Sequence, residues 1–427
     1  MESIIYHIDV NSAFLSWEAV YRIKHLGESL DLREIPAVVG GSEESRHGIV
    51  LAKSIPAKKY KIQTGEPLVD ARRKCPNLVV VPPNYSMYVE ASKAFINILK
   101  EYSPNVQQYS IDEAFADMTG TSSLFGSPVE AANMIKDRIY QELGFTVNIG
   151  IGPNKLLAKM ASDFKKPNMV HTLFDWEIKD KFWPLPVSDL FFVGRKTEAK
   201  LYKLGINTIG ELANADRDML HAVLKSHGDM VWQFANGIGD QMDKVTLNPV
   251  NKGYGNSITI PFDVTDARTA KLVLLSLTET VGSRIRADGA FISVVSVSIV
   301  DYDFNYSTRQ STLISATNIT KQIYDAACEI FDKLWNHIPI RQLGVHTSKA
   351  TKECAYQYSL FETQDADKLA RLDEAVDSIR KKYGEDSVMR ASFIKSKKNS
   401  NEVDNKLDHM SGGLDKARRT GMTKTIE

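Results

Sequence analysis

The segment Tyr109-Ser-Ile-Asp-Glu-Ala-Phe115 sets two adjacent acids, Asp112 and Glu113, among apolar neighbours. Residues 106–118 read as two short strands that meet at this acid pair. Burying two carboxylates without a partner would cost several kcal/mol for each, so a compensating cation is expected beside them. Hard carboxylate oxygens suit Mg²⁺ or Mn²⁺ and not zinc.

A third acid, Asp9, follows the apolar run 4–8, which reads as a buried strand. A lone acid at a strand end is commonly a turn residue or a helix N-cap, and this interpretation stays open for Asp9 taken alone. Two ions held by shared carboxylates can stabilise both the attacking and the leaving oxygen of an in-line phosphoryl transfer. On spacing alone, a two-metal site and an ordinary set of turn acids are both open.

The elements around these acids alternate in an order that predicts the fold. Ser127-Pro-Val-Glu130 begins a helix, with Ser as N-cap, Pro in the first position and Glu closing a capping box. The order strand, helix, strand, strand, helix, strand predicts a ferredoxin-like sheet with the acids at strand ends. The predicted helices are 11–25, 88–102, 127–143 and 154–164, with a further strand at 145–151 and an insertion at 28–79 that contains a strand candidate at 48–52.

The rest of the chain reads as smaller modules. Short helices broken by glycines follow Pro184 and predict a small all-helical domain. Residues 248–349 mix strand-like and helical runs and predict a compact α/β module beyond a linker near 240–251. Its predicted strands are 292–299 and 312–314 and its helices 271–286 and 318–335, followed by an amphipathic helix near 365–382 and a polar, basic tail from Lys395.

Length and composition exclude several classes of protein. The chain has 427 residues, enough for about three domains, and its 43% hydrophobic and 25% charged residues are those of a folded, non-membrane protein. No secretory signal and no apolar stretch of about 20 residues is visible. Cys75, Cys328 and Cys354 fit neither a disulfide framework nor a zinc site, and point to a reducing cytoplasm.

The charge is balanced overall but not locally. There are 53 Lys and Arg against 53 Asp and Glu, which at first argues against a nucleic-acid partner. However, residues 53–74 carry seven bases and two acids, residues 154–167 four lysines and one acid, and residues 380–427 twelve bases and seven acids. These segments could follow a phosphate backbone, although each one alone is more typical of a solvated lysine-rich surface.

Three separated motifs resemble those of a known family. Asp9-Val-Asn-Ser-Ala-Phe14, Ser110-Ile-Asp-Glu-Ala-Phe115 and the run from Gly150 to Asp163, continued by Lys165-Lys-Pro-Asn168, are similar to the signatures of bacterial Y-family translesion DNA polymerases of the DinB/UmuC branch. The resemblance extends in order from residue 3 to about 350. It implies a multi-domain α/β (α+β) right-hand polymerase with these parts: palm 1–11 and 80–173, fingers 12–79, thumb 174–240, linker 241–252, little finger 253–350 and C-terminal tail 351–427.

The resemblance implies a role for individual residues. Asp9, Asp112 and Glu113 match the metal-binding carboxylates for two Mg²⁺ ions, with Mn²⁺ as a possible substitute, and the carbonyl of Val10 matches an extra ligand. Phe14 falls on the steric gate under the sugar, whereas a phenylalanine on a helix without this context would be read as a core residue. The remaining nucleotide-binding positions are Lys58 and Lys166 at the triphosphate and Leu51 and Ala52 over the nascent base pair.

This chain also departs from the family pattern. Ile55-Pro-Ala-Lys58 stands where the family usually has Tyr-x-Ala-Arg, so a tyrosine hydroxyl is lost at Ile55 and a bidentate guanidinium at Lys58. Asn11 replaces an aspartate that is not a metal ligand in the family. These changes affect the expected nucleotide affinity and not the carboxylates.

Two further segments point to partners. Residues 191–205, with Gly194, Arg195 and Lys196 at the turn, resemble a helix–hairpin–helix that presents backbone N–H groups to DNA phosphates; an ordinary helical turn is the alternative. Gln357-Tyr-Ser-Leu-Phe361 resembles the peptide that binds the sliding clamp, with Leu360 and Phe361 as apolar anchors; a last strand of the little finger is the alternative.

The resemblance as a whole implies a monomeric cytoplasmic enzyme of DNA damage tolerance. It would extend a primer–template with dNTPs in an error-prone manner past lesions, without a membrane partner. One alternative is a catalytically weak DNA-binding accessory protein of the same architecture, against which the three intact carboxylates argue. Another is a different two-metal enzyme on a ferredoxin-like sheet, such as a nucleotide cyclase, against which Phe14 and the thumb and clamp motifs argue.

Overall fold

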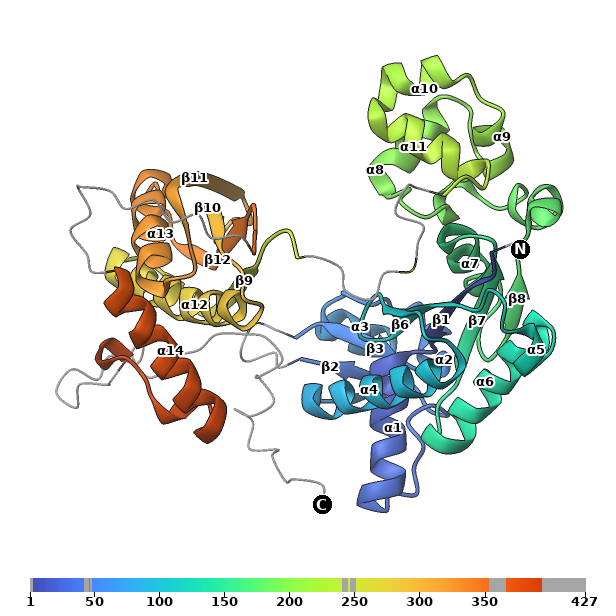
Figure 1. Ribbon diagram of the computed structural model, residues 1–427, viewed down its shortest axis with the longest axis horizontal. Coiled ribbons are helices and arrows are strands. Elements are labelled where there is room, and N and C mark those ends of the chain that lie inside the picture. Colours follow the sequence, from blue (N-terminus) through green and yellow to red (C-terminus); the bar gives the residue numbers. More distant parts are fainter. Residues whose placement is uncertain are drawn as a thin grey trace. The chain divides into compact units, whose positions relative to one another are not determined.

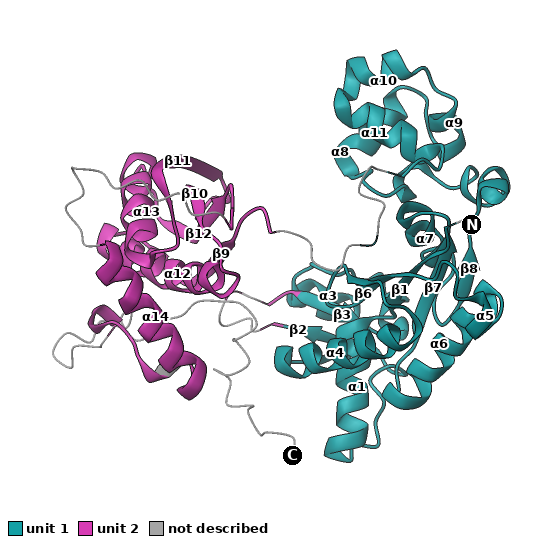
Figure 2. Cartoon of the chain, viewed as in Figure 1, with its two compact units in different colours: residues 1–40, 50–249 teal, residues 41–49, 250–427 magenta. Residues whose placement is uncertain are grey.

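The computed structural model describes residues 3–41, 46, 48–239, 245, 251–352 and 366–393, which form two compact units (Figures 1 and 2). Unit 1 comprises residues 1–40 and 50–249, and unit 2 comprises residues 41–49 and 250–427. The clamp-like peptide 357–361, the tail from Lys395 and most of the predicted linker lie outside the described residues. Within the described part, no helix is long and apolar enough to cross a membrane.

A five-stranded sheet forms the centre of unit 1. Its order is β5-β6-β1-β7-β8, with β1 antiparallel to both neighbours and β8 parallel to β7. Strands β1, β5, β6 and β7 of this sheet therefore have the ferredoxin-like arrangement predicted from the sequence. The strands are β1 (Ile5–Val10), β5 (Val106–Gln108), β6 (Glu113–Asp117), β7 (Val147–Gly152) and β8 (Val170–Thr172).

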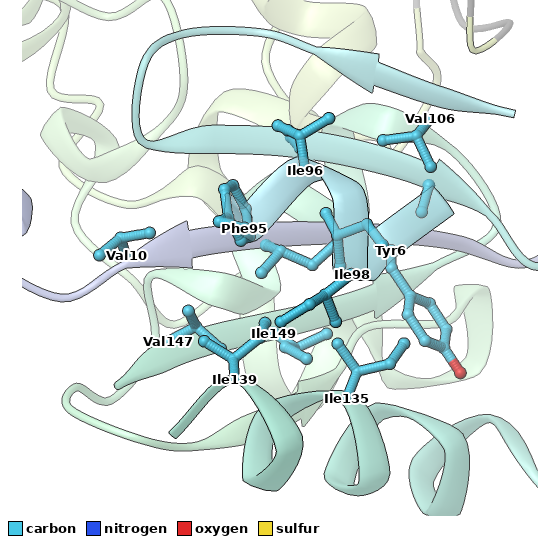
Figure 3. Close-up of a cluster of buried hydrophobic side chains, with 14 of the residues drawn as sticks. Tyr6, Val10, Phe95, Ile96, Ile98, Val106, Ile135, Ile139, Val147 and Ile149 are labelled. Carbon is cyan, nitrogen blue, oxygen red and sulfur yellow. The ribbon is translucent and has the colours of Figure 1, made fainter. Parts of the chain in front are cut away.

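Helices cover both faces of this sheet. On one face, α4 (Tyr85–Tyr102) and α6 (Pro128–Leu143) bury an apolar core against alternate residues of the strands (Figure 3). Helix α6 begins at the Ser127 capping box and ends at the left-handed Gly144, as the sequence predicted. On the other face, α7 (Lys155–Ser162) packs so closely on β7 that a Cβ on Gly150 would lie 2.0 Å from the carbonyl oxygen of Ala158.

The segment between β1 and α4 forms a smaller layer. Strands β3-β2-β4 make a three-stranded sheet beside α1, of which the sequence predicted only the strand at 48–52. The missed strands have three or four residues, too few to show an alternating pattern. The elements are α1 (Ala13–Leu26), β2 (Ala37–Gly40), β3 (Val50–Lys53), α2 (Ile55–Lys58), α3 (Leu68–Lys74) and β4 (Val79–Val81), and a short helix, α5 (Ser122–Phe125), was also not predicted.

The helical module predicted after Pro184 packs around an apolar core that it shares with side chains of α7, among them Leu157 and Met160. The helices are α8 (Arg195–Lys203), α9 (Ile209–Ala213), α10 (Arg217–Leu224) and α11 (Ser226–Ala235), preceded by short helical turns at 175–177, 178–182 and 187–189.

Unit 2 is an antiparallel four-stranded sheet, β11-β10-β12-β9, whose core is shared with two helices. The sequence predicted both helices and the two strands β10 and β11, but missed β9 and β12. The elements are β9 (Gly255–Val264), α12 (Ala267–Ala287), β10 (Ile292–Asp301), β11 (Tyr306–Thr317), α13 (Thr320–Leu334), β12 (Ile340–Ser348) and α14 (Ala366–Tyr383), with helical turns at 385–387 and 391–393.

Candidate active site

Strand register brings the predicted acids together. In the β1–β6 pair, Asp9 lies directly opposite Glu113, so their side chains leave the same face of the sheet. Asp112 is the last residue of the preceding turn, and its carbonyl accepts a hydrogen bond from the Val10 backbone at 3.0 Å. The Ser110 hydroxyl donates to Asp112 Oδ1 at 2.7 Å and orients that carboxylate. Residues 100 positions apart in the chain thus share one site.

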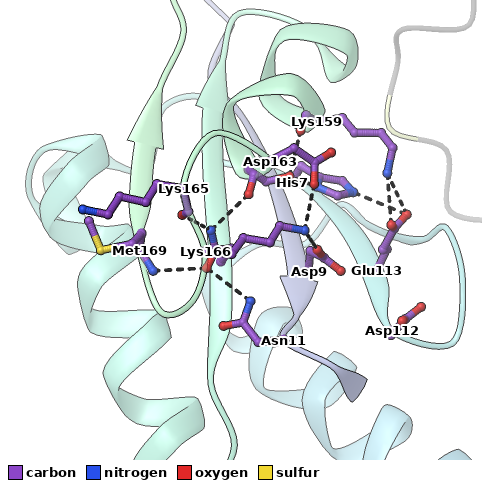
Figure 4. A network of polar contacts seen from close by, with 12 residues as sticks. His7, Asp9, Asn11, Asp112, Glu113, Lys159, Asp163, Lys165, Lys166 and Met169 are labelled. Atoms are coloured by element: carbon purple, nitrogen blue, oxygen red, sulfur yellow. Dashed lines mark hydrogen bonds and ion pairs between the residues drawn. The ribbon is translucent and has the colours of Figure 1, made fainter. Parts of the chain in front are cut away.

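Two lysines form ion pairs with two of the three carboxylates (Figure 4). Lys159 Nζ lies 3.0 Å from both oxygens of Glu113. Lys166 forms an ion pair with Asp9 and a second one with Asp163 at 2.7 Å. The cation that the sequence led us to expect beside Glu113 is therefore supplied, in this structure, by a side chain of α7.

These contacts determine the proton affinities of the acids. Burial by itself raises the pKa of Glu113, but contact with His7 and the charge of Lys159 outweigh it and lower that pKa to about 2. Burial raises the pKa of Asp9 despite the nearby Lys166 ammonium. The pKa of Lys166 is raised because the Asp9 and Asp163 carboxylates outweigh the effect of its burial. Glu113 is thus firmly ionised, whereas burial of Asp9 favours its neutral form unless a cation stays beside it.

His7 is a member of the site that sequence reasoning missed. Its ring is buried, with Nδ1 2.8 Å from the Ser162 hydroxyl and Nε2 3.6 Å from Glu113 Oε2. Burial lowers the pKa of His7, which keeps the ring neutral. Its signal in the sequence was a single polar residue inside the apolar run that precedes Asp9. Lys159 was also missed, although it stands in the quoted third motif.

The predicted nucleotide-binding residues converge on one cavity of about 500 Å³ within unit 1. Both the central sheet and the smaller layer contribute to its wall, as the sequence interpretation requires. Glu113 does not line this cavity, because its carboxylate is turned to Lys159. The predicted residues that line it are Asp9, Val10, Phe14, Leu51, Ala52, Lys58, Asp112 and Lys166, and Lys53, Ile55 and Thr64 join them.

Phe14 is fixed at the wall of the cavity by aromatic packing. Its ring stacks on Tyr88 at 4.6 Å between centroids with 13° between the planes, and Trp17 lies 6.0 Å away. The same side chain packs against the core and lines the cavity, so the two interpretations of Phe14 describe two sides of one ring.

The structure shows where the positions that depart from the family pattern lie. Ile55 and Lys58 are the ends of the short helix α2 and line the cavity, and the Ser54 hydroxyl caps that helix. Asn11 is held outside the carboxylate group, because its Oδ1 accepts hydrogen bonds from Asn168 N at 2.9 Å and from the Thr146 hydroxyl at 3.0 Å. This position acts as a structural tie.

The chemistry of the donor set fits a hard divalent cation. Asp9 and Asp112 both line the same cavity, as does Val10. Nevertheless, no group of three or more ligating side chains is gathered around one point in the part of the chain that the structure describes. Because Lys159 holds Glu113 and Lys166 holds Asp9, binding of a metal ion by these two carboxylates would require both ion pairs to be exchanged for metal–carboxylate contacts.

The predicted hairpin lies at the start of α8. Gly194 is the N-cap residue of that helix, and Arg195 and Lys196 follow it at the surface. The preceding Phe192 has φ 71°, in the left-handed region that favours glycine, with 55% of its surface exposed.

Comparisons with known proteins agree with this geometry. The impB/mucB/samB family model matches residues 8–163, the C-terminal domain model of that family matches residues 251–360, and a model named IMS family HHH motif matches residues 177–206. The last of these ranges contains Gly194, Arg195 and Lys196. The three matches follow the same order along the chain as the modules described above.

Several curated relatives match nearly the whole chain. A protein named DNA polymerase IV from Clostridium acetobutylicum is 47% identical over 394 residues, which is 92% of this chain and 99% of that protein. The DNA polymerase IV of Acetivibrio thermocellus is 38% identical, with 93% of this chain and 99% of that protein covered. The DNA polymerase IV 2 of Bacillus subtilis is 36% identical, with 92% and 95% covered.

Among solved structures, a chain titled Y-family DNA polymerase chimera Dbh-Dpo4(243-245)-Dbh has a similar fold. Its TM-score is 0.69 at 21% identity, with 82% of this chain and 100% of that chain covered. The motifs, the fold and the near-complete match to these relatives lead to one conclusion: this chain belongs to the impB/mucB/samB family, the DinB/UmuC branch of the Y-family DNA polymerases.

Proposed function

We propose that this DNA-directed DNA polymerase carries out translesion synthesis, joining a nucleotide from a dNTP to a primer 3′-hydroxyl opposite a damaged template base. The observation that carries the proposal is the shared cavity, in which Asp9 and Asp112 face Phe14, Lys58 and Lys166. Two Mg²⁺ ions, or Mn²⁺, would supply positive charge at the attacking and leaving oxygens. Asp9, Asp112 and Glu113 would hold these ions, together with the Val10 carbonyl.

The side chains of this chain divide the remaining work. Lys58 and Lys166 would bind the triphosphate, and in doing so Lys166 would leave Asp9 and free that carboxylate. Phe14 would lie under the sugar, where its stacked ring leaves no room for a 2′-hydroxyl. Leu51 and Ala52 would cover the nascent base pair with small apolar side chains, which tolerate an altered template base.

Partner contacts follow from the outer modules. Arg195 and Lys196, with backbone N–H groups near Gly194, would bind phosphates of the primer–template. The Gln357–Phe361 peptide, outside the described residues, would bind a sliding clamp in extended form, with Leu360 and Phe361 in apolar pockets. The protein would act as a cytoplasmic monomer without a membrane partner.

Primer extension on intact and lesion-bearing templates tests the catalytic proposal. Asp112→Ala is expected to abolish extension, whereas the control Asp137→Ala, an exposed acid on α6, should extend as the wild type does. Equal activity in all three proteins would remove Asp112 from the reaction. No activity in any of them would favour the catalytically weak accessory protein, an alternative to which the loss of a hydroxyl at Ile55 lends some support.

Binding of the isolated sliding clamp tests the peptide. Phe361→Ala is expected to weaken binding, because Phe361 is an apolar anchor. The control Tyr358→Ala changes the same peptide at a position without that role. Equal binding by both variants and the wild type would show that the clamp is not bound there.

A further inference from the structure

Helix α14 is attached to unit 2 by charged side chains. Asp373 and Arg380 are buried, and Arg286 of α12 lies 3.1 Å from Asp373 and 2.6 Å from Asp377. Arg380 reaches Glu279 of α12 at 2.9 Å. The apolar core of unit 2 contains no α14 side chain among the described residues. The helix therefore docks with a polar face, which is the reverse of a usual amphipathic helix.

The polar contact fixes the orientation of the helix without burying its apolar side chains against the domain. The Asp373 carboxylate also accepts a hydrogen bond from the Thr320 backbone at 2.7 Å, and Arg390 forms an ion pair with Glu279. Buried charges with several defined partners tolerate little rotation of the helix, because a turned helix would leave them unpaired. The direction of the remaining faces of α14 is thus determined.

An apolar stripe lies beside this polar face. It repeats at intervals of three and four residues, the spacing of a helix that packs along a second helix. Successive helical residues are about 100° apart, so the stripe covers a sector from about 40° to about 120° on one side of Asp373. The stripe consists of Leu369, Leu372, Val376, Ile379 and Tyr383, of which Leu372 is 51%, Ile379 40% and Tyr383 67% exposed.

The outer border of the stripe is basic. Lys368, Arg371 and Lys382 follow it on the solvent side, whereas Asp367 and Glu374 lie further around the helix. A second copy of α14 would bring the same bases against each other, so an identical helix is disfavoured. The complementary occupant is an apolar ridge at helical spacing with acidic borders.

The chain itself contains such a segment soon after the described residues end at Phe393. Residues 402–410 read Glu-Val-Asp-Asn-Lys-Leu-Asp-His-Met, with Val403, Leu407 and Met410 at helical spacing and acids around them. Eight residues separate Phe393 from this segment, and an unstructured chain of that length would span about 16 Å on average. A tether of this length gives an effective concentration of the order of millimolar, so even weak contacts would be populated.

We propose that residues 402–410 dock in cis on the apolar stripe of α14, with their acids against its basic border. The C-terminal segment then covers a surface that would otherwise be free to associate with other proteins. This role is independent of the polymerase reaction, because every residue involved lies beyond the cavity and in unit 2.

Photo-cross-linking of the full chain tests the proposal. A benzoylphenylalanine in place of Ile379 is expected to cross-link to residues 402–410, while the same group in place of Ser378, off the stripe, should not. Equal mixing of isotopically light and heavy protein separates cross-links within a chain from those between chains. Cross-links between chains would show that a second copy covers the stripe, and absence of cross-links to the tail would show that the tail does not; either result overturns the proposal.

Charge reversal tests the proposed recognition. With E402K/D404K/D408K, the Ile379 cross-link is expected to fall about tenfold, and adding K368E/K382E to the same protein should restore it. All five positions are on exposed or terminal residues, and hydrogen exchange of α14 checks that the helix stays folded. A cross-link that persists in the reversed variant, or that the second reversal does not restore, would contradict docking by complementary charge.

Discussion

Replacing Lys159 with methionine separates two roles that the structure combines in one ion pair. Lys159 Nζ is 3.0 Å from both Glu113 oxygens, and the Glu113 side chain is only 22% exposed. Removing one partner of a fully buried pair costs about 3–5 kcal/mol, and partial solvent screening reduces this to about 2 kcal/mol here. Without metal, Lys159→Met should therefore unfold about 4–8 °C below the wild type.

The pH dependence of this loss has a definite sign. The pKa of Glu113 is lowered from 4.5 to about 2, so the ion pair stabilises the folded state fully above pH 4.5. That contribution is lost as the pH falls from 4.5 towards 2. The difference in stability between wild type and variant should accordingly be constant above pH 4.5. Below pH 4.5 it should shrink as the pH falls.

Divalent cations should narrow the stability difference between the two proteins. Lys159 competes for Glu113, so its removal leaves three carboxylates with one fewer neighbouring cation, and Mg²⁺ should stabilise the variant more than the wild type. Thermal unfolding with and without Mg²⁺, with Lys165→Met as a control at an exposed lysine of the same segment, measures both effects. A variant as stable as the control without metal, or one that gains less from Mg²⁺ than the wild type, would refute competition.

The other predictions concern single positions. Phe14→Ala should raise ribonucleotide incorporation about 10- to 100-fold in primer extension, and unchanged sugar selection would exclude Phe14 as the gate. Gly150→Ala should sharply lower the unfolding midpoint, because its Cβ would lie 2.0 Å from the Ala158 carbonyl; a wild-type midpoint would mean that α7 can shift away from β7. Phe192→Gly should gain about 1 kcal/mol in denaturant unfolding by relieving φ 71°; a loss of stability would show that the ring's contacts with Phe191 and Phe234 outweigh the strain.

The sequence was most informative where local patterns and long-range geometry coincide. The alternation of strands and helices predicted the central sheet, because the capping box at Ser127 and the apolar run before Asp9 are local signals. The sheet order predicted acids at strand ends, but their assignment to one metal site came from the resemblance to the Y-family motifs, because spacing alone left two interpretations open. The short strands β2 and β4 were missed, since three or four buried residues carry no period.

The partners of the acids could not be predicted from the same patterns. Lys159 reaches Glu113 only because α7 crosses β1 and β7 on the side of the sheet that carries both acids, which depends on tertiary packing. The polar attachment of α14 was equally hidden. Its amphipathic pattern indicates an apolar contact with the domain. In the structure the contact is instead polar, through ion pairs with Arg286 and Glu279.

Because Asp9 lies opposite Glu113, the geometry of the active site depends on the register between strands β1 and β6. Side chains alternate along a strand, so a shift of one residue between β1 and β6 would turn one carboxylate into the apolar core. An insertion or deletion of a single residue within 109–111 would risk such a shift without altering any side chain of the cavity. Length at this turn should therefore be under stronger constraint than the identity of its exposed residues.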